Sequence, residues 1–146
     1  QDSYDLTHEV FVAFNYGLQR TQDHFGPEEL AYTREVLPAL VRRYVNENNP
    51  DLTAEMISCM TYLGYHGDDA YREGLDYLLD SQNANGTWGD YERYRPYYGR
   101  YLDQHVYLHT TMVACRALME AYEGNWASAD APATPRVEES DAASPD

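Results

Sequence analysis

The chain has 146 residues, of which 43% are hydrophobic and 24% charged, a length and composition typical of one globular domain with a hydrophobic core. Its 25 acidic and 10 basic side chains give a formal net charge of −15, which disfavours nucleic acid and anionic membrane surfaces as partners because both are negatively charged. The sequence contains no apolar run long enough to cross a bilayer and no signal-peptide pattern, so we expect a soluble protein, and the residues do not distinguish a secreted from a cytoplasmic one.

The first two predicted helices span residues 5–19 and 26–46. In the first, apolar residues recur with helical spacing and Asp5 is placed to cap the start. The second opens with a glycine, a proline and two glutamates, a pattern typical of helix N-termini. Pro38 is expected to kink or interrupt this helix, because proline has no backbone N–H.

Three further helices are predicted at residues 51–63, 68–82 and 104–122. The first two begin at aspartates, and the first and third are followed by Gly64 and Gly124, which are typical of helix ends. No segment shows the apolar alternation of a β-strand. The sequence therefore predicts an all-α fold.

After about residue 126 the sequence becomes small, acidic and proline-containing, a composition that cannot offset the entropy lost on folding. We therefore expect a helical domain at residues 1–126 and a disordered acidic tail at residues 127–146. Because the sequence starts with Gln1 rather than Met, we expect a processed protein, an excised portion or a piece of a longer polypeptide.

The two cysteines, Cys59 and Cys115, both lie in predicted helices. They are compatible with one disulfide or with two buried thiols. Two buried thiols are favoured, because free cysteine is among the most buried residue types.

The most specific string is GLDYLLDSQNANGTW at residues 74–88. It predicts a helix that ends at Gln82, a turn through Gly86 and a Trp88 ring that folds back over the helix end. The string resembles the QW repeat of squalene and oxidosqualene cyclases. The resemblance implies the α/α toroid of the terpenoid cyclase and protein prenyltransferase superfamily, here as a partial or open array of about five helices. The acidic motifs of terpene cyclases are absent, so cyclase activity is disfavoured.

In such a toroid, outer and inner helices alternate around a central cavity. If the helix that carries the QW-like string is an outer one, the first, third and fifth predicted helices are inner, and their starts line one mouth. The side chains brought together by this assumption are Thr7, His8, Glu9, Asp51, Glu55, His105, His109 and Thr110.

This group predicts a metal site. His105 and His109 are four residues apart and share one helix face, a spacing at which two imidazoles bind one metal ion. With His8 as third ligand, the set suits one divalent transition metal, Zn, Fe or Mn. Glu9 and Glu55 are the candidate catalytic acid or base. In the competing interpretation, these residues only cap helices and form hydrogen bonds in the core.

A tyrosine-rich loop at residues 90–101 lies between the last two predicted helices. Four of its rings, together with Asp51, are the candidate substrate-binding residues: Tyr94, Tyr97, Tyr98 and Tyr101. Tyrosine and arginine can stack on sugars or aromatic groups, so the loop is predicted to cover the cavity mouth as a lid. Alternatively, the rings pack on the rim of the array.

Three functional hypotheses follow. The first is a domain that binds a small molecule, glycan or peptide and has a histidine and carboxylate metal site. The second is a mononuclear metal-dependent enzyme, or its catalytic fragment, acting on a small hydroxylated or aromatic substrate. The third is a structural accessory domain of a longer chain or assembly.

Overall fold

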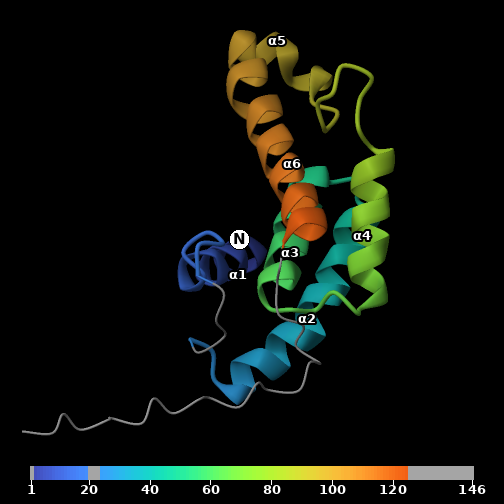
Figure 1. Ribbon diagram of the computed structural model, residues 1–146. Helices are drawn as coiled ribbons and strands as arrows, with labels where there is room; N and C mark the ends of the chain where they lie inside the picture. The colour runs from blue at the N-terminus through green and yellow to red at the C-terminus, as the bar shows by residue number, and fades with distance from the viewer. Residues whose placement is uncertain (1, 20–23, 125–146) are drawn as a thin grey trace, which may run out of the picture.

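The computed structural model describes residues 2–19 and 24–124, and within this part of the chain it contains helices and no strand (Figure 1). The predicted tail at residues 127–146 lies outside the described residues. The main helices are α1 (Asp2–Ala13), α2 (Pro27–Asn46), α3 (Pro50–Tyr62), α4 (Asp69–Asp80) and α6 (Leu108–Glu123). Three shorter elements precede α6: the 3-10 helix η1 (Glu92–Tyr94), α5 (Arg95–Tyr98) and the π-helix η2 (Leu102–Tyr107). The prediction of an all-α fold is confirmed.

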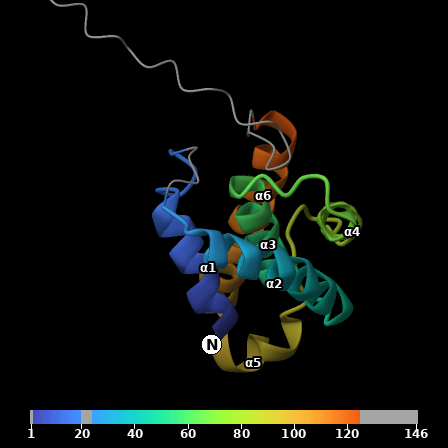
Figure 2. The ribbon, with the colours of Figure 1, turned by 90° about the horizontal axis from the view of Figure 1, so that it is seen from below.

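Helix α3 is the centre of the fold. All its residues from Thr53 to Tyr62 are buried, and α1, α2, α4 and α6 all pack against it. The view from below shows these four helices arranged around α3 (Figure 2). Among the helices of the described ranges, none is long and apolar enough to span a bilayer.

The helix starts follow from local side-chain chemistry. The carboxylate of Glu29 accepts a hydrogen bond from the Gly26 amide at the start of α2, and Asn49 caps α3 by accepting from the Leu52 amide. Asp68 caps α4 by accepting from the Ala70 amide. Each side chain satisfies an amide that the helix itself leaves unpaired.

The first predicted helix differs from the observed one. α1 begins at Asp2, so Asp5 lies inside the helix and is not its cap, and α1 ends at Ala13 rather than near residue 19. The backbone then turns left-handed, with φ values of 46° at Asn15 and 51° at Tyr16. A right-handed helix cannot continue through this conformation.

Of the two outcomes predicted for Pro38, a kink or an interruption of the second helix, the interruption does not occur. Pro38 is buried inside α2, which runs from Pro27 to Asn46. Packing against the central helix α3 offsets the hydrogen bond that proline cannot donate.

The turn after α4 has part of the local geometry that its sequence predicts, although α4 ends at Asp80 rather than at Gln82. The Trp88 indole is 3% exposed, and its Nε1 donates a 2.7 Å hydrogen bond to the carbonyl oxygen of Leu78 in the last turn of α4. The Gln82 amide donates to the carbonyl oxygen of Gly86, 3.2 Å away. Trp88 and Gln82 therefore hold the end of α4 and the turn that follows it.

The contact between α3 and α6 combines small apolar side chains with one polar link. Ala114 and Ala117 of α6 are fully buried. The Tyr62 hydroxyl of α3 donates a 2.8 Å hydrogen bond to Oε1 of Glu120, and the Arg116 guanidinium donates to the same oxygen. This polar link fixes which face of α6 is turned toward α3.

Both cysteines are free thiols. Cys59 is buried, as expected, but Cys115 is exposed. The expectation of a second buried thiol is wrong, because the face of α6 that carries Cys115 is turned away from α3.

Candidate metal and ligand site

The starts of three helices meet at one end of the molecule. A cavity of about 760 Å³ lies there and is lined by Tyr4 of α1, Asp51 of α3, His105 of η2 and His109 of α6. Small-molecule pockets typically measure roughly 300–1,000 Å³, so a cavity of this volume can hold a small ligand.

Three side chains of this region form a compact group, which we call the Asp51–Glu55–His109 cluster. One ligand atom from each residue lies within 4.8 Å of those of the other two. The Nε2 atom of His109 is 3.4 Å from Oδ1 of Asp51. Glu55 is only 3% exposed, whereas the His109 side chain is 58% exposed. The cluster therefore has a buried and a solvent-facing side.

The fold brings the cluster together in two steps. Asp51 and Glu55 are one turn apart in the first half of α3, so both project from the same helix face. His109 lies in the first turn of α6, and α6 packs along α3. Two local carboxylates are thus joined by an imidazole from a distant part of the sequence.

Burial raises the pKa of the Glu55 carboxyl, and the negative charge of Asp51 raises it further. The hydrogen bond from the Thr7 hydroxyl, 2.8 Å from Oε2 of Glu55, acts in the opposite direction, as do His8 and His109. Two carboxylates thus share a confined space in which additional positive charge is favourable.

Asp51 has an unsatisfied polar atom. Its Oδ1 is buried and accepts no hydrogen bond from any part of the chain that the structure describes, although the His109 ring nitrogen lies at ion-pair distance. Most buried polar atoms have a hydrogen-bond partner. This oxygen is therefore available to a cation.

The other two predicted histidine ligands lie outside the cluster. The His8 ring lies against the Tyr4 ring at a tilt of 32°, with ring centres 3.8 Å apart, and its Nδ1 is 2.9 Å from the Tyr4 carbonyl oxygen. His105 stacks on Tyr101, with ring centres 4.1 Å apart, at the cavity wall. The predicted pairing of His105 with His109 requires an α-helix, but His105 lies in the π-helix η2. In a π-helix, hydrogen bonds join residues five apart, and side chains four apart no longer align.

The two candidate acid and base residues lie in different places. Glu55 belongs to the cluster, whereas Glu9 is exposed and lines a groove with Phe25 and Tyr32, between α1 and α2. The structure therefore does not bring Glu9 to the cavity.

The tyrosine-rich segment is more ordered than the lid that the sequence predicts. It forms η1 and α5, and Arg95 holds the two ends together through ion pairs with Glu92 and Asp103. Of the four predicted tyrosines, Tyr94 and Tyr101 line the cavity. Two do not line it: Tyr97, which is 83% exposed, and Tyr98, whose ring packs beside the Tyr94 and Tyr101 rings.

Tyr91 is a cavity residue that the sequence pattern does not single out. Its ring lines the cavity, and its hydroxyl lies 3.0 Å from the Thr110 hydroxyl. Burial raises the pKa of Tyr91, and the nearby charge of Asp51 adds to this effect. The available signal was its position in the tyrosine-rich segment, but periodicity does not show which of these rings face the cavity.

Sequence comparison places this helical domain in a family. A family model described as "Domain of unknown function (DUF6895)" matches residues 1–119, and the chain belongs to this family. The matched range contains all three residues of the Asp51–Glu55–His109 cluster. A search of curated proteins found no match. A search of solved structures found none either.

Proposed function

We propose that this domain binds one divalent transition metal ion at the Asp51–Glu55–His109 cluster and holds a small ligand in the adjacent cavity. The observation that carries the proposal is the approach of three potential ligand atoms, from two helices, to within 4.8 Å of one another. Ligand atoms of a tetrahedral ion, each about 2.1 Å from the metal, lie roughly 3.4 Å apart. The 3.4 Å between His109 Nε2 and Asp51 Oδ1 matches this spacing.

The chemistry of the ligand set favours Zn, Mn or Fe, because an imidazole and two carboxylates suit borderline and hard divalent ions. The Thr7 hydroxyl donates a hydrogen bond to Oε2 of Glu55. This bond holds the carboxylate in a fixed orientation, as hydrogen-bond partners of metal ligands commonly do. Bound metal also offsets the repulsion between the two carboxylates.

The cavity wall favours a hydroxylated or aromatic ligand. Its lining includes the rings of Tyr91, Tyr94 and Tyr101 beside the polar side chains of Asn48 and Asn49. Aromatic faces stack on sugar and aromatic rings, while amides and hydroxyls form hydrogen bonds to them. A small molecule, a glycan or a peptide side chain fits this description.

A second candidate function is a mononuclear metal-dependent enzyme. The raised pKa of the Glu55 carboxyl favours it, because an acid or base that works near neutral pH needs such a shift. In this variant of the proposal, Glu55 exchanges a proton with a bound substrate, and Asp51 and His109 hold the metal.

We also propose that the five main helices form an open portion of an α/α toroid. Two observations support this arrangement. Trp88 covers the end of α4 as a QW-type clamp would, and the starts of α1, α3 and the η2–α6 segment share one cavity. A cavity shared by alternate helices is the arrangement that a ring of inner and outer helices would produce.

Calorimetric titration with ZnCl₂ and MnCl₂ tests the metal site. The proposal expects one ion per chain, and binding that is lost in Asp51→Asn and in His109→Ala. His105→Ala is the matched control, because this imidazole lines the same cavity but lies outside the cluster. Equal loss in His105→Ala would contradict the proposed ligand set, and absence of binding by the unmodified chain would contradict the metal site itself.

A further inference from the structure

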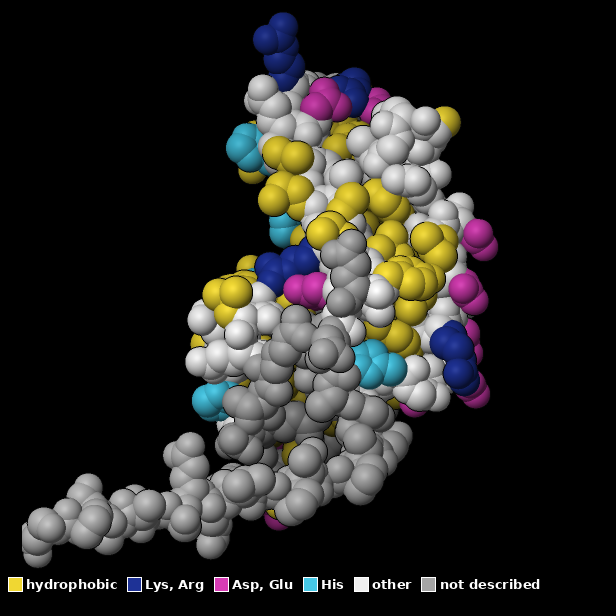
Figure 3. Space-filling view, viewed as in Figure 1, with side chains coloured by type: hydrophobic (Ala, Val, Ile, Leu, Met, Phe, Trp, Pro, Cys, Tyr) yellow, Lys and Arg dark blue, Asp and Glu magenta, His cyan; other side chains and the backbone are white. Residues whose placement is uncertain are grey.

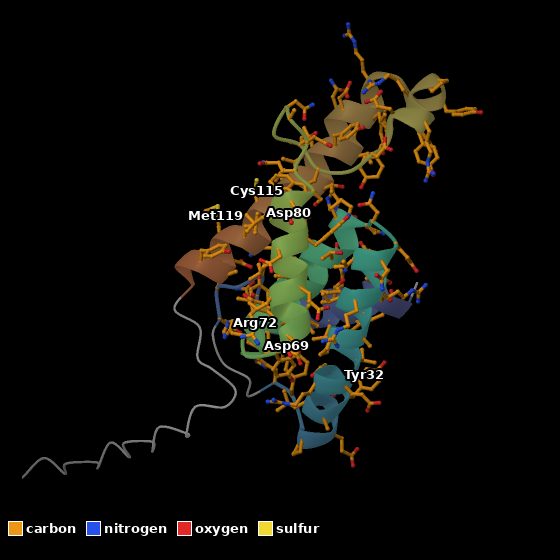
Figure 4. The ribbon with its side chains drawn as sticks, turned by 90° about the vertical axis from the view of Figure 1, so that its right-hand side faces the viewer. Tyr32, Asp69, Arg72, Asp80, Cys115 and Met119 are labelled. Atoms are coloured by element: carbon orange, nitrogen blue, oxygen red, sulfur yellow. The ribbon has the colours of Figure 1, made fainter. Side chains whose placement is uncertain are left out.

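A row of apolar side chains runs along the solvent-facing side of α6. We call it the α6 stripe: Leu108, Met112, Cys115, Met119 and Tyr122. Leu108 is 51% exposed, Met112 62%, Met119 57% and Tyr122 68%, and Cys115 is also exposed. Figure 4 shows Cys115 and Met119 on the same stretch of α6, beside α4. The space-filling view shows hydrophobic side chains gathered over α6 and toward α4 (Figure 3).

The stripe is separate from the face that α6 uses inside the domain. Among the side chains of α6 that the structure describes, Thr110, Ala114 and Ala117 are buried, and α6 packs along α3. The members of the stripe alternate in steps of four and three residues along the chain. This is the spacing of the contact positions in a coiled coil, where one helix packs along another.

The order of side chains in the stripe identifies a suitable partner. Read from either end, it runs large residue, methionine, cysteine, methionine, large residue. An antiparallel second copy with its two-fold axis at Cys115 would place Met112 against Met119 and Leu108 against Tyr122. A two-fold interface requires a surface that is complementary to itself, and this row meets the requirement.

Charge also favours contact at this surface. The chain has a formal net charge of −15, so two copies repel each other over most of their surfaces. None of the five side chains of the stripe is acidic, and the nearby Glu120 carboxylate is paired with Arg116 and Tyr62. Two copies can therefore approach along these five side chains without bringing Glu120 into the contact as an unpaired charge.

The exposed area is sufficient for a specific contact. Four large side chains that are 51–68% exposed, together with the exposed Cys115, present on the order of 500 Å² per copy, so that two copies bury on the order of 1,000 Å², near the lower limit for specific interfaces. The buried area would be mostly apolar, which is the main source of affinity in such a contact.

We propose that the α6 stripe is a self-association surface on which a second copy of this chain packs its own α6 in antiparallel orientation. The contact joins the outer sides of two domains and leaves the cavity near α5 accessible. It is independent of the proposed metal site.

Sedimentation equilibrium of the full chain tests the proposal. We expect a dimer whose dissociation constant increases by about tenfold or more in Met112→Glu and in Met119→Glu, because each change places two carboxylates in an apolar contact. Val12→Glu is the matched control: Val12 is 66% exposed on α1, outside the stripe, so this variant should remain a dimer. Circular dichroism verifies that each variant keeps its helical content.

A short bismaleimide crosslinker gives a second measurement, because it joins two thiols that lie close together. The crosslinked dimer should form with the unmodified chain and with Cys59→Ser, and should be lost in Cys115→Ser. A chain that sediments as a monomer at all concentrations would overturn the proposal, and slow alkylation of Cys115 in that monomer would identify another segment of the same chain as the cover. A dimer that survives both methionine substitutions would place the interface elsewhere.

Discussion

The hydroxyl of Thr7 lies 2.8 Å from Oε2 of Glu55 and donates a hydrogen bond to it, joining α1 to α3 across 48 residues of sequence. Thr7 is fully buried and Glu55 is 3% exposed, so water does not replace this bond if it is lost. The same hydroxyl lies 2.9 Å from the Tyr4 carbonyl oxygen. A single hydroxyl proton serves one acceptor at a time, and the ionised carboxylate is the stronger of the two.

Replacement of Thr7 by valine should destabilise the domain. Valine keeps the branched shape but removes the donor, and leaving a buried acceptor unsatisfied costs about 1–3 kcal/mol. The cost should be largest where Glu55 is ionised and should shrink as the pH falls and the carboxyl becomes protonated. Urea unfolding followed by circular dichroism, near neutral pH and in mild acid, measures both values.

Thr33→Val is the matched control for this experiment. Thr33 is also buried, but its hydroxyl pairs with the neutral Tyr65 hydroxyl, 2.9 Å away, and with a backbone carbonyl oxygen. The stability lost in Thr33→Val should therefore be independent of pH over the same range. If both variants show the same pH dependence, the Thr7 effect does not arise from the charge of Glu55.

Glu55→Gln should change how stability depends on pH. Because burial and Asp51 raise the pKa of Glu55 in the folded chain, the folded state binds this proton more tightly than the unfolded state does. The stabilisation that the protonated Glu55 carboxyl gives the folded chain is fully present below the ordinary glutamate pKa. It is lost as the pH rises through the raised pKa of the folded state. Glutamine does not titrate, so the stability of Glu55→Gln relative to the unmodified chain should increase with pH.

Thermal unfolding in metal-free buffer, from mild acid to neutral pH, measures the difference in stability between Glu55→Gln and the unmodified chain. If the stability of Glu55→Gln relative to the unmodified chain stays constant, or decreases as the pH rises, the raised pKa is contradicted. In the Glu55→Gln background, Thr7→Val should lose its pH dependence, because the group that titrates is gone.

Much of the fold could be predicted from local sequence. Asp68 before α4 and Gly26–Pro27 before α2 carry helix-start chemistry that acts within one turn, and both starts are within one residue of their predicted places. The end of α1 could not be found in this way. It depends on left-handed backbone at Asn15 and Tyr16, neither of which is a glycine, so the sequence gives only a weak signal there.

The candidate site could be predicted in part. Helix alternation indicated that the starts of the first, third and fifth helices meet, and Asp51, Glu55 and His109 do lie together. The positions of His105 and Glu9 could not be predicted. His105 depends on the π-helix η2, which the sequence pattern did not indicate, and Glu9 depends on the rotation of α1 about its own axis, which packing against α3 decides.

The contact between α4 and α3 gives the sharpest test of packing in this fold. A Cβ atom added at Gly74 would lie 2.6 Å from Cδ1 of Ile57 and 2.9 Å from Cγ1 of Val41. Alanine is the better helix former by about 1 kcal/mol, yet overpacking of a buried site costs about 1–3 kcal/mol. Gly74→Ala should therefore give no net stabilisation and should lower the free energy of unfolding by up to about 2 kcal/mol.

Ile57→Val separates overpacking from other causes of this loss. Alone, it removes the Cδ1 methyl group and costs about 0.5–1.5 kcal/mol. In the Gly74→Ala background the same change clears the closest contact, so it should cost less or become stabilising, and the two substitutions should not be additive. Urea unfolding of the unmodified chain, the two single variants and the double variant completes this double-mutant cycle. Additive effects would show that α4 moves away from α3 to accept the new methyl group.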